Sequence, residues 1–357
     1  MIDREITIEK ATTLKEKPET SSLDFGRSFT DHMFILDYSD EAGWHNGRIV
    51  PYAPLQMDPA AIALHYGQSV FEGLKAYLTD EGDIQLFRPE KNIERLNRSS
   101  ARLCIPEIDV DEAVDAIKKL VHFEKDWIPN QDGTSLYIRP FIIGTEAFLG
   151  VAPSTNYQYI VILSPVGAYY KEGMNPIKIA VEDTYVRAVV GGTGEAKTGG
   201  NYAAGLIAQE TVSKKGFAQV LWLDGVEGKY VEEVGSMNVF FKINGEVITP
   251  ELRGSILPGV TRDSVIQMLK HWDVPVTERR ISMQEIYEAH KDGSLEEAFG
   301  TGTAAVISPM GQLTWENKDM IINDNQTGEL ATKLYDALTN MQYGKSEDPF
   351  NWIVKVN

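Results

Sequence analysis

The chain has 357 residues, more than one hydrophobic core usually serves, so we expect two domains. Hydrophobic residues make up 43% of the chain and charged residues 24%, which is an ordinary globular composition and argues against disorder. The formal net charge of -18 argues against a nucleic-acid partner, because such binding depends on clustered Lys and Arg side chains.

The N-terminal residues 1–24 are polar and contain Pro18 and a Thr/Ser cluster, so we expect a poorly ordered arm. This arm lacks the apolar core of a signal peptide, and no apolar run approaches the roughly 18 residues that a membrane helix needs. Cys104 is the only cysteine, which excludes an intrachain disulfide and a cysteine-rich metal site. We therefore expect a cytoplasmic protein with no metal site and no membrane association.

Residues 25–166 are predicted to form a small N-terminal α+β domain. Helical periodicity covers residues 88–103 and 110–123. Strands rich in β-branched and aromatic residues are predicted at 135–144 and 157–166. The mixture of the two patterns is the reason for the α+β assignment.

A turn-rich linker at 167–176 is predicted to lead into a large C-terminal domain at 177–357, which opens with a strand. The dipeptides Asp224-Gly225 and Asn244-Gly245 are typical of hairpin turns, and they bracket one long predicted strand at 230–243. Helices are predicted at 261–272, 283–290 and 330–341. Strands joined by hairpins and mixed with helices favour an α+β fold over a doubly wound parallel sheet.

Lys197 is the only cation in the glycine-rich sequence GGTGEAKTGGNY, where backbone can approach a ligand closely. The ordinary alternative is a solvated surface lysine. The segment nearly matches a nucleotide-binding P-loop, but Ala196 stands where that loop requires glycine before the lysine. The other candidate is a lysine that forms a Schiff base with an aldehyde cofactor such as pyridoxal phosphate.

A pyridoxal cofactor also needs an acid for its ring nitrogen. In VEEVGSMNVFF, strand alternation places Glu233 on an otherwise apolar face with Val231 and Met237. A buried carboxylate needs a partner, and a pyridinium N–H would serve; the alternative is a structural salt bridge. The neighbouring Glu232 is expected on the opposite face, as ordinary polar surface.

A phosphate group needs free backbone donors. Pro258-Gly259 precedes a helical pattern, so the amides of Val260 and Thr261 are expected at a helix N-terminus. A second segment of small residues, FGTGTAAV at 299–306, offers further amides and hydroxyls. Each of these features, taken alone, is also consistent with an ordinary turn.

Four motifs, EAKTGGNY, EVGSMN, LPGVTR and FGTGTAA, occur in the order and approximate spacing of fold-type IV pyridoxal-phosphate enzymes. In the first half, FGRSFTDHM, LHYGQSVFEGLKAY, RPEKNIERLNRSSARLCIP, LYIRPFIIG and SPVGAYY agree with them. From residue 25 onward the chain resembles the branched-chain amino acid aminotransferases. The resemblance implies a two-domain α+β fold of the D-amino acid aminotransferase-like type, pyridoxal 5'-phosphate as cofactor, and a homodimer.

The resemblance implies a role for each matching residue at the cofactor. Lys197 would be the Schiff-base lysine and proton shuttle, Glu233 would pair with the pyridine nitrogen, and Tyr202 would donate to the phenolate oxygen. The phosphate would be held by Arg95, the backbone of Val260 and Thr261, and Thr303. Without the resemblance, Arg95 would be interpreted as a helix-surface charge.

The resemblance also implies a substrate site. The α-carboxylate would be held by Tyr66 and the amides of Thr303 and Ala304. The side-chain pocket would be lined by Phe25, Phe71, Tyr137, Val151, Tyr169 and Met237, which would otherwise be interpreted as core. Arg139 is a charge within the apolar strand YIRPFIIG, and with Tyr137 it would take the second carboxylate of glutamate.

The implied reaction transfers the amino group of L-leucine, L-isoleucine or L-valine to 2-oxoglutarate, and the reverse, by a ping-pong mechanism. A D-amino acid aminotransferase or an aminodeoxychorismate lyase of the same fold is the first alternative, and a nucleotide-binding module built on GGTGEAKT is a remote one. Where animal members carry a C-x-x-C pair after the GTA turn, this chain has Ala305 and Ser308. A redox switch at that place is therefore not expected.

Overall fold

The computed structural model describes residues 6–167 and 173–356. The chain divides into two compact units. Unit 1 comprises residues 1–169, 196–199 and 340–357, and unit 2 comprises residues 170–195 and 200–339. The predicted limits of arm, domains and linker stay predictions. Part of the arm (1–5) and part of the linker (168–172) lie outside the described residues.

Unit 1 is built on one mixed sheet. Its strands are β1 (Thr7–Ile8), β2 (His32–Ser39), β3 (Gly43–Pro51), β4 (Ser69–Phe71), β5 (Leu74–Leu78), β6 (Ile84–Phe87), β7 (Ser135–Gly144), β8 (Asn156–Val166) and β18 (Ile353–Val356). Across the described residues their order is β1-β3-β2-β8-β7-β5-β6-β18, with β4 paired to β7. Only β1 and β3 pair in parallel there; the other neighbours are antiparallel.

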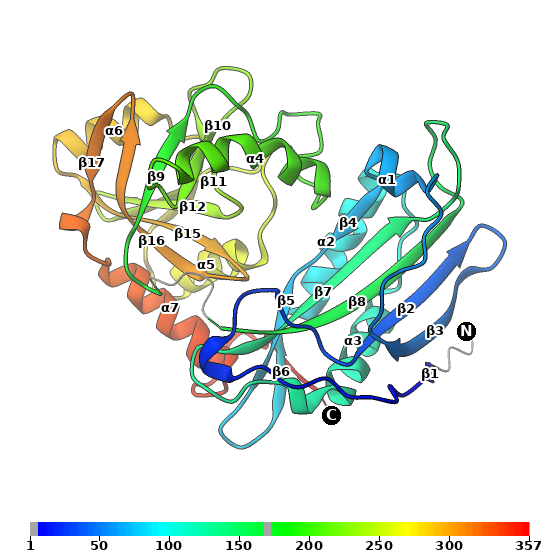
Figure 1. Ribbon diagram of the computed structural model, residues 1–357. Helices are drawn as coiled ribbons and strands as arrows, with labels where there is room; N and C mark the ends of the chain where they lie inside the picture. Colours follow the sequence, from blue (N-terminus) through cyan, green and yellow to red (C-terminus); the bar gives the residue numbers. More distant parts are fainter. Residues whose placement is uncertain (1–5, 168–172, 357) are drawn as a thin grey trace. The chain divides into compact units, whose positions relative to one another are not determined.

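Helices of unit 1 pack on this sheet and form its main core (Figure 1). They are α1 (Ile62–Tyr66), α2 (Pro89–Arg102) and α3 (Val110–Phe123), with short 3₁₀ turns η1 (Thr20–Ser22) and η2 (Lys125–Trp127). Ile93 and Leu96 of α2 and Ile117 and Leu120 of α3 are fully buried against strand residues. Asp109 caps α3 by accepting the N–H of Glu112, which helps to set the helix start. The helices and strands predicted for this half are confirmed.

The described part of the arm makes specific contacts within unit 1, which differs from its expected poor order. Backbone N–H groups of Ala11 and Lys15 donate to His32 Nε2 and Asp31 Oδ1, at 2.8 and 2.7 Å. Because Nε2 accepts, the His32 proton lies on Nδ1, which contacts the buried carboxylate of Glu124. Side-chain acceptors far along the chain therefore fix the arm, and composition does not reveal them.

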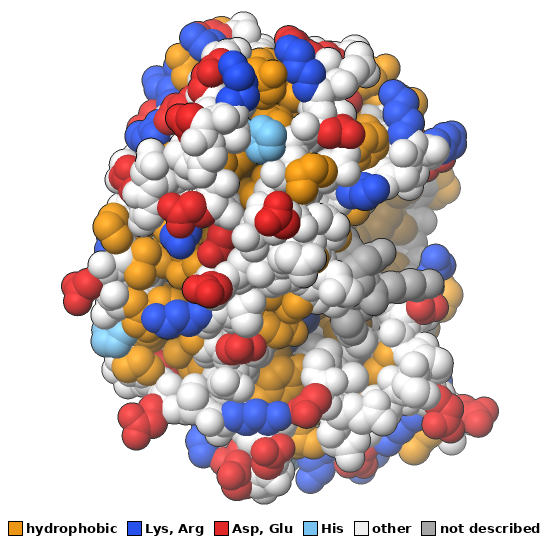
Figure 2. Space-filling view, turned by 90° about the vertical axis from the view of Figure 1, so that its left-hand side faces the viewer, with side chains coloured by type: hydrophobic (Ala, Val, Ile, Leu, Met, Phe, Trp, Pro, Cys, Tyr) orange, Lys and Arg blue, Asp and Glu red, His pale blue; other side chains and the backbone are white. Residues whose placement is uncertain are grey.

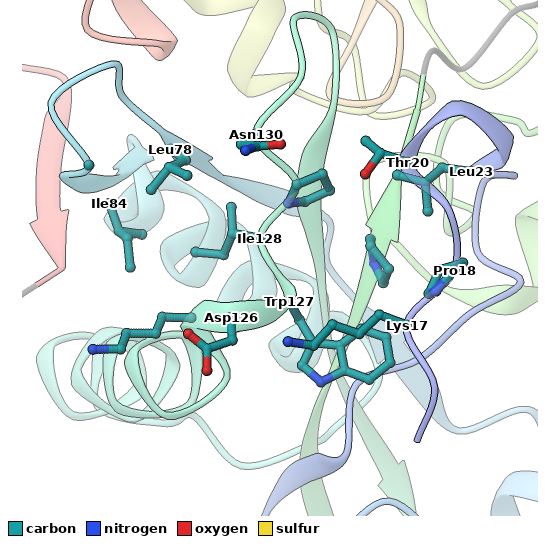
Figure 3. A pocket seen from close by; sticks show the side chains of 14 residues that line it. Lys17, Pro18, Thr20, Leu23, Leu78, Ile84, Asp126, Trp127, Ile128 and Asn130 are labelled. Atoms are coloured by element: carbon teal, nitrogen blue, oxygen red, sulfur yellow. The ribbon is translucent and has the colours of Figure 1, made fainter. Parts of the chain in front are cut away.

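A pocket of about 450 Å³ lies between the arm and η2 (Figure 3). The arm contributes Lys17 and Leu23, and the opposite wall includes Trp127 and Ile128. Lys17 Nζ stands 5.9 Å from the centroid of the Trp127 ring. None of the residues that the resemblance assigns to the active site lines this pocket.

Unit 2 carries a second mixed sheet. Its strands are β9 (Ile177–Glu182), β10 (Gln219–Leu223), β11 (Val231–Val234), β12 (Asn238–Ile243), β13 (Glu246–Thr249), β14 (Val276–Glu278), β15 (Leu295–Gly302), β16 (Val306–Trp315) and β17 (Lys318–Ile321). In the part of the chain that the structure describes, their order is β11-β10-β9-β16-β15-β12-β13-β14, with β17 paired to β16. The predicted turn at Asn244-Gly245 is confirmed, because both residues have positive φ (50° and 76°) between the antiparallel β12 and β13. Asp224-Gly225 instead begins a longer loop that closes on Tyr230, whose carbonyl accepts the N–H of Asp224.

The single long strand predicted at 230–243 is wrong. The chain turns at Gly235 and Ser236, between β11 and β12. Gly235 has φ 56°, and its N–H donates to the carbonyl of Val220 at 2.7 Å. A Cβ on Gly235 would stand 2.1 Å from Gln219 Oε1, so only glycine fits this turn. Strand alternation therefore does not continue from Glu233 to Met237.

Helices cover both faces of the unit 2 sheet around β10 (Figure 1). They are α4 (Gly199–Ser213), α5 (Val260–His271), α6 (Met283–Lys291) and α7 (Glu329–Gln342), with the 3₁₀ turn η3 (Asn323–Asn325). Val220 packs with Ala208 of α4, whereas its neighbour Leu221 packs in a cluster with Ile286 of α6. Successive strand residues face opposite sides of a sheet, so the two helices lie on opposite faces. Both units combine helices with sheets rich in antiparallel pairs, and the predicted α+β class is confirmed.

The described surface mixes charges of both signs. On the face shown in Figure 2, acidic, basic and apolar side chains are interspersed, without a continuous basic patch among the described residues. Within residues 6–167 and 173–356, no helix is long and apolar enough to cross a membrane.

Candidate active site

Lys197 is held by its backbone between two elements of unit 1. Its carbonyl accepts the N–H of Phe71, at the end of β4, at 3.0 Å. Its own N–H donates to the hydroxyl of Ser99 on α2 at 2.8 Å. The next residue, Thr198, forms a bridge with Val70 and donates its hydroxyl to the carbonyl of Ser69. The lysine is therefore placed by main-chain bonds that do not depend on its side chain.

A buried ion pair adjoins Lys197 in unit 1. Arg95, on α2, donates from Nε and Nη2 to the two carboxylate oxygens of Glu72, at 2.7 and 2.9 Å. The side chains are 4% and 0% exposed. Burial opposes the charge of Glu72, but the charge and hydrogen bonds of Arg95 and the charge of Lys197 hold its pKa below the usual value. Arg95 is thus a buried, paired cation and not a helix-surface charge.

Four residues assigned to the side-chain pocket come together in unit 1. Arg139 donates from Nη2 to the hydroxyl of Tyr137 at 2.9 Å, and its guanidinium lies 4.9 Å from the centroid of the Phe71 ring. Lys197 Nζ lies 4.9 Å from the same ring. Phe25 packs edge-on against Tyr137, with ring centroids 4.9 Å apart. The Nε of Arg139 is buried and has no hydrogen-bond partner among the described residues.

Three further residues implied for the substrate site stand differently. Tyr66, at the end of α1, is 43% exposed, and its hydroxyl donates to the carbonyl of Leu149. Val151, in the loop after β7, is 86% exposed. Tyr169 lies outside the described residues. The roles of all three stay predictions.

Glu233, in unit 2, is 2% exposed and ion-paired within the protein. Its Oε2 lies 3.1 Å from Nε of Arg187, which is 8% exposed. Its Oε1 accepts the N–H of Leu257 at 2.7 Å. The structural salt bridge that was the alternative interpretation therefore exists, and the inference that burial alone calls for a cationic ligand is wrong. A role of Glu233 toward a ring nitrogen stays a prediction.

The prediction that Glu232 is ordinary polar surface is wrong. All four residues of β11 are buried, and Glu232 is 7% exposed. One of its oxygens accepts the Ser255 hydroxyl, and the other has no hydrogen-bond partner among the described residues. Burial, and to a lesser extent the charge of Asp224, raise the pKa of Glu232. The prediction failed because β11 is covered on both faces.

The LPG segment of unit 2 meets both Glu233 and the start of α5. Asn238, in EVGSMN, donates from Nδ2 to the carbonyl of Leu257 at 2.9 Å, and Glu233 accepts the N–H of the same residue. Gly259 is the N-cap of α5 and provides no side chain to cap the helix. The first amides of such a helix have no intrahelical acceptor and favour an anion. Val260 and Thr261 occupy these positions.

The FGTGTAA segment lies beside Met237 in unit 2. β12 pairs with β15, so that Asn238 stands opposite Thr301. A Cβ on Gly300 would stand 2.8 Å from Met237 Cε, which explains why glycine is needed there. The hydroxyl of Thr301 is buried without a hydrogen-bond partner among the described residues. Thr303 and Ala304 lie half-buried in the turn after β15, and Tyr202 lies half-buried on α4.

Each unit brings together chemically useful groups. Unit 1 places a primary amine near a buried guanidinium–carboxylate pair and a second, partly unsatisfied guanidinium. Unit 2 places a buried carboxylate–guanidinium pair beside an uncapped helix N-terminus and a small-residue turn. An amine able to act as nucleophile and base, together with sites for anions, suits covalent chemistry on a phosphorylated carbonyl compound.

The sequence reasoning missed Glu72, Asn92 and Arg187. Glu72 stands in VFEGL and Arg187 in YVRAVV, so each is a charge within an apolar run. The same signal was used for Arg139, and it could have indicated these two as buried charges that need partners. Nothing in the sequence pairs Arg187 with Glu233 or Glu72 with Arg95.

The family model for amino-transferase class IV matches residues 69–313. The chain is 61% identical over 356 residues to branched-chain-amino-acid aminotransferase 2 of Bacillus subtilis (strain 168), covering 100% of this chain and 98% of that protein. The crystal structure of the Escherichia coli branched-chain amino acid aminotransferase matches with a TM-score of 0.77 and 27% identity, over 92% of this chain and 99% of that one. The branched-chain amino acid aminotransferase of T.th., complexed with N-(5'-phosphopyridoxyl)-L-glutamate, matches with a TM-score of 0.73 and 28% identity, over 90% and 98% of the two chains.

Proposed function

The chain belongs to the amino-transferase class IV family, and we propose that it is a branched-chain-amino-acid aminotransferase. It exchanges amino groups between L-leucine, L-isoleucine or L-valine and 2-oxoglutarate in two ping-pong half-reactions. The observation that carries the proposal is full-length similarity to a relative of that name. The lysine held between β4 and α2 supports it, because that residue supplies the reacting amine.

Pyridoxal 5'-phosphate is the cofactor we assign, and the residues present fit it. Lys197 has a primary amine, Arg95 is a buried cation, and α5 begins without a side-chain cap. The Thr301 hydroxyl, buried without a partner among the described residues, is a further donor beside the GTGTAA turn. When bound, this cofactor supplies an aldehyde for the lysine and a ring that withdraws electrons from the substrate Cα.

The residues of this chain then have distinct roles. Lys197 binds the cofactor aldehyde, and after the substrate displaces it, its free amine takes the Cα proton and returns a proton to the cofactor carbon. Glu233, held by Arg187 and by the Leu257 N–H, stabilises positive charge at the ring nitrogen. Tyr202 donates to the phenolate oxygen. The phosphate is held by Arg95, Thr303 and the backbone of Val260 and Thr261.

The substrate roles follow the same assignment. Tyr66 and the amides of Thr303 and Ala304 hold the α-carboxylate. Aliphatic side chains lie among Phe25, Phe71, Tyr137, Val151, Tyr169 and Met237. Arg139 is held by Tyr137 and packed on Phe71, and it binds the distal carboxylate of glutamate. One pocket thereby accepts an apolar and an acidic side chain.

Arg139→Met should lower kcat/KM for L-glutamate by roughly 10- to 1000-fold and affect L-leucine much less, because it removes a charge-assisted pair but keeps apolar volume. Steady-state kinetics with each amino donor measure the ratio. Arg98→Met, an exposed arginine on α2, is the control and should change neither value. Equal losses for both donors would show that Arg139 is structural.

We also assign a homodimer. An apolar group in unit 1, formed by Leu64, Phe148, Leu149 and Val151, is exposed by 61%, 46%, 62% and 86%. Such clustered exposure is typical of a surface that another chain covers. Sedimentation equilibrium measures the state, and a monomer at micromolar concentration would contradict the assignment. The cytoplasmic location stays a prediction.

The function is tested by following glutamate formed from L-leucine and 2-oxoglutarate. We expect turnover with L-leucine, L-isoleucine and L-valine and none with D-alanine. Turnover with D-alanine alone would favour the D-amino acid aminotransferase alternative, and pyruvate released from aminodeoxychorismate would favour the lyase. Neither alternative is favoured by the names of the relatives.

A further inference from the structure

Glu72 has an environment that the proposed mechanism does not use. Its side chain is 0% exposed and accepts four hydrogen bonds: two from Arg95, one from Asn92 Nδ2 at 2.9 Å and one from the N–H of Gly73 at 3.1 Å. Its own N–H donates to the carbonyl of Pro140 at 2.7 Å. A carboxylate held at its backbone and at both oxygens occupies one position.

One face of α2 connects this carboxylate to Lys197. Asn92, Arg95 and Ser99 are spaced by three and four residues, so they lie on the same side of the helix. All three are buried, at 2%, 4% and 0% exposure. The first two contact Glu72, and the third accepts the N–H of Lys197. The polar stripe of α2 therefore places the reacting lysine and the Arg95–Glu72 pair in a common framework.

We propose that Glu72 is a positioning residue for the cofactor phosphate, acting by fixing the plane and location of the Arg95 guanidinium. The proposal rests on the proposed function, which gives Arg95 its phosphate role. Both oxygens of Glu72 grip one edge of the guanidinium, the Nε–Nη2 edge, and a two-point pair fixes orientation as well as distance. The ion pair formed on folding thus pre-organises the cation for a second anion.

The proposal makes a prediction opposite in sign to simple electrostatics. Glu72 is an anion close to a residue that binds an anion, so removing its charge should strengthen phosphate binding if charge alone matters. If Glu72 positions Arg95, removing the charge frees the guanidinium to move and weakens phosphate binding. The direction of the change therefore separates the two accounts.

The test compares the affinity of the full chain for pyridoxal 5'-phosphate and for pyridoxal, which lacks the phosphate. The ratio of the two dissociation constants isolates the phosphate contribution and needs no turnover. In Glu72→Gln we expect this ratio to fall by roughly 10- to 100-fold, the size of a hydrogen bond to a charged group. An unchanged or increased ratio would overturn the proposal.

Two variants keep the test decisive if Glu72→Gln folds poorly. Glu72→Asp retains the charge but shortens the reach, so it should also lower the ratio; a wild-type ratio in this variant would overturn the proposal. Glu72→Gln combined with Arg95→Gln removes both charges and should show the same ratio as Arg95→Gln alone. Glu94→Gln, a partly exposed residue of α2 paired with Lys91, is the matched control and should leave the ratio unchanged.

The Arg95→Gln variant distinguishes failure of this inference from failure of the assigned site. If Arg95→Gln lowers the ratio and Glu72→Gln does not, Arg95 binds phosphate without help from Glu72 and the inference is overturned. If Arg95→Gln itself leaves the ratio unchanged, the phosphate role of Arg95 is wrong, and the inference fails with it.

Discussion

Lys197→Ala should lower the rate of amino-group transfer from L-leucine by roughly 100- to 10,000-fold or more. The substitution removes both the amine that binds the cofactor and the base that moves the Cα proton. The backbone bonds of residue 197 to Ser99 and Phe71 do not involve its side chain, so we expect the fold to persist. Steady-state kinetics measure the loss, and circular dichroism checks the fold.

Lys91→Ala is the matched control for this prediction, because Lys91 is an exposed lysine on α2. We expect it to keep the wild-type rate. Added methylamine should restore part of the activity of Lys197→Ala by replacing the missing base. A Lys197→Ala variant with near-native turnover would mean that another group performs the proton transfer.

Glu233→Gln should slow Cα deprotonation by roughly 100- to 1000-fold, because an amide cannot stabilise positive charge at the ring nitrogen. It should also destabilise the fold by about 3 to 5 kcal/mol, because Arg187 remains buried without its carboxylate partner. Single-turnover kinetics measure the first effect and urea unfolding the second. Replacing Arg187 with Met in the same chain should recover part of the stability and none of the rate.

Glu251→Gln serves as the control for Glu233, because Glu251 is partly exposed whereas Glu232 is buried and unsuitable for the comparison. We expect Glu251→Gln to match the wild type in rate and stability. A Glu233→Gln variant that loses stability but keeps its rate of deprotonation would show that Glu233 is only the salt-bridge partner of Arg187.

The helices could be predicted from the sequence because their signals are local. Apolar spacing and a capping residue define α3, and similar patterns define α5 and α6. The turn at Asn244-Gly245 is also local, since both residues favour positive φ. Elements of this kind carry their own instructions and need no knowledge of distant contacts.

The break between β11 and β12 could not be predicted in the same way. Glycine is permitted within a strand and within a turn, and the choice at Gly235 depends on the Val220 carbonyl and on the Gln219 side chain. Both residues belong to β10, a neighbouring strand. The burial of Glu232 has the same origin, because it depends on what covers the second face of β11.

The candidate site was assembled from motifs, and its ion pairs were not. The pairing of Glu72 with Arg95, and of Arg187 with Glu233, joins residues far apart in the chain. Sequence alone indicates that a buried charge needs a partner but does not identify it. The structure supplies these partners, and they change the interpretation of Glu233 and Arg95 from isolated charges to members of buried pairs.

Borohydride reduction of the protein with pyridoxal 5'-phosphate, followed by peptide mapping, tests the covalent role of Lys197 most directly. The account predicts that the pyridoxyl group is found on the Lys197 peptide. Lys75 is the strongest competitor, because burial lowers its pKa to about 8 and leaves part of its amine neutral and nucleophilic near neutral pH. A label on Lys75, on Lys91 or on any lysine other than Lys197 would contradict the account.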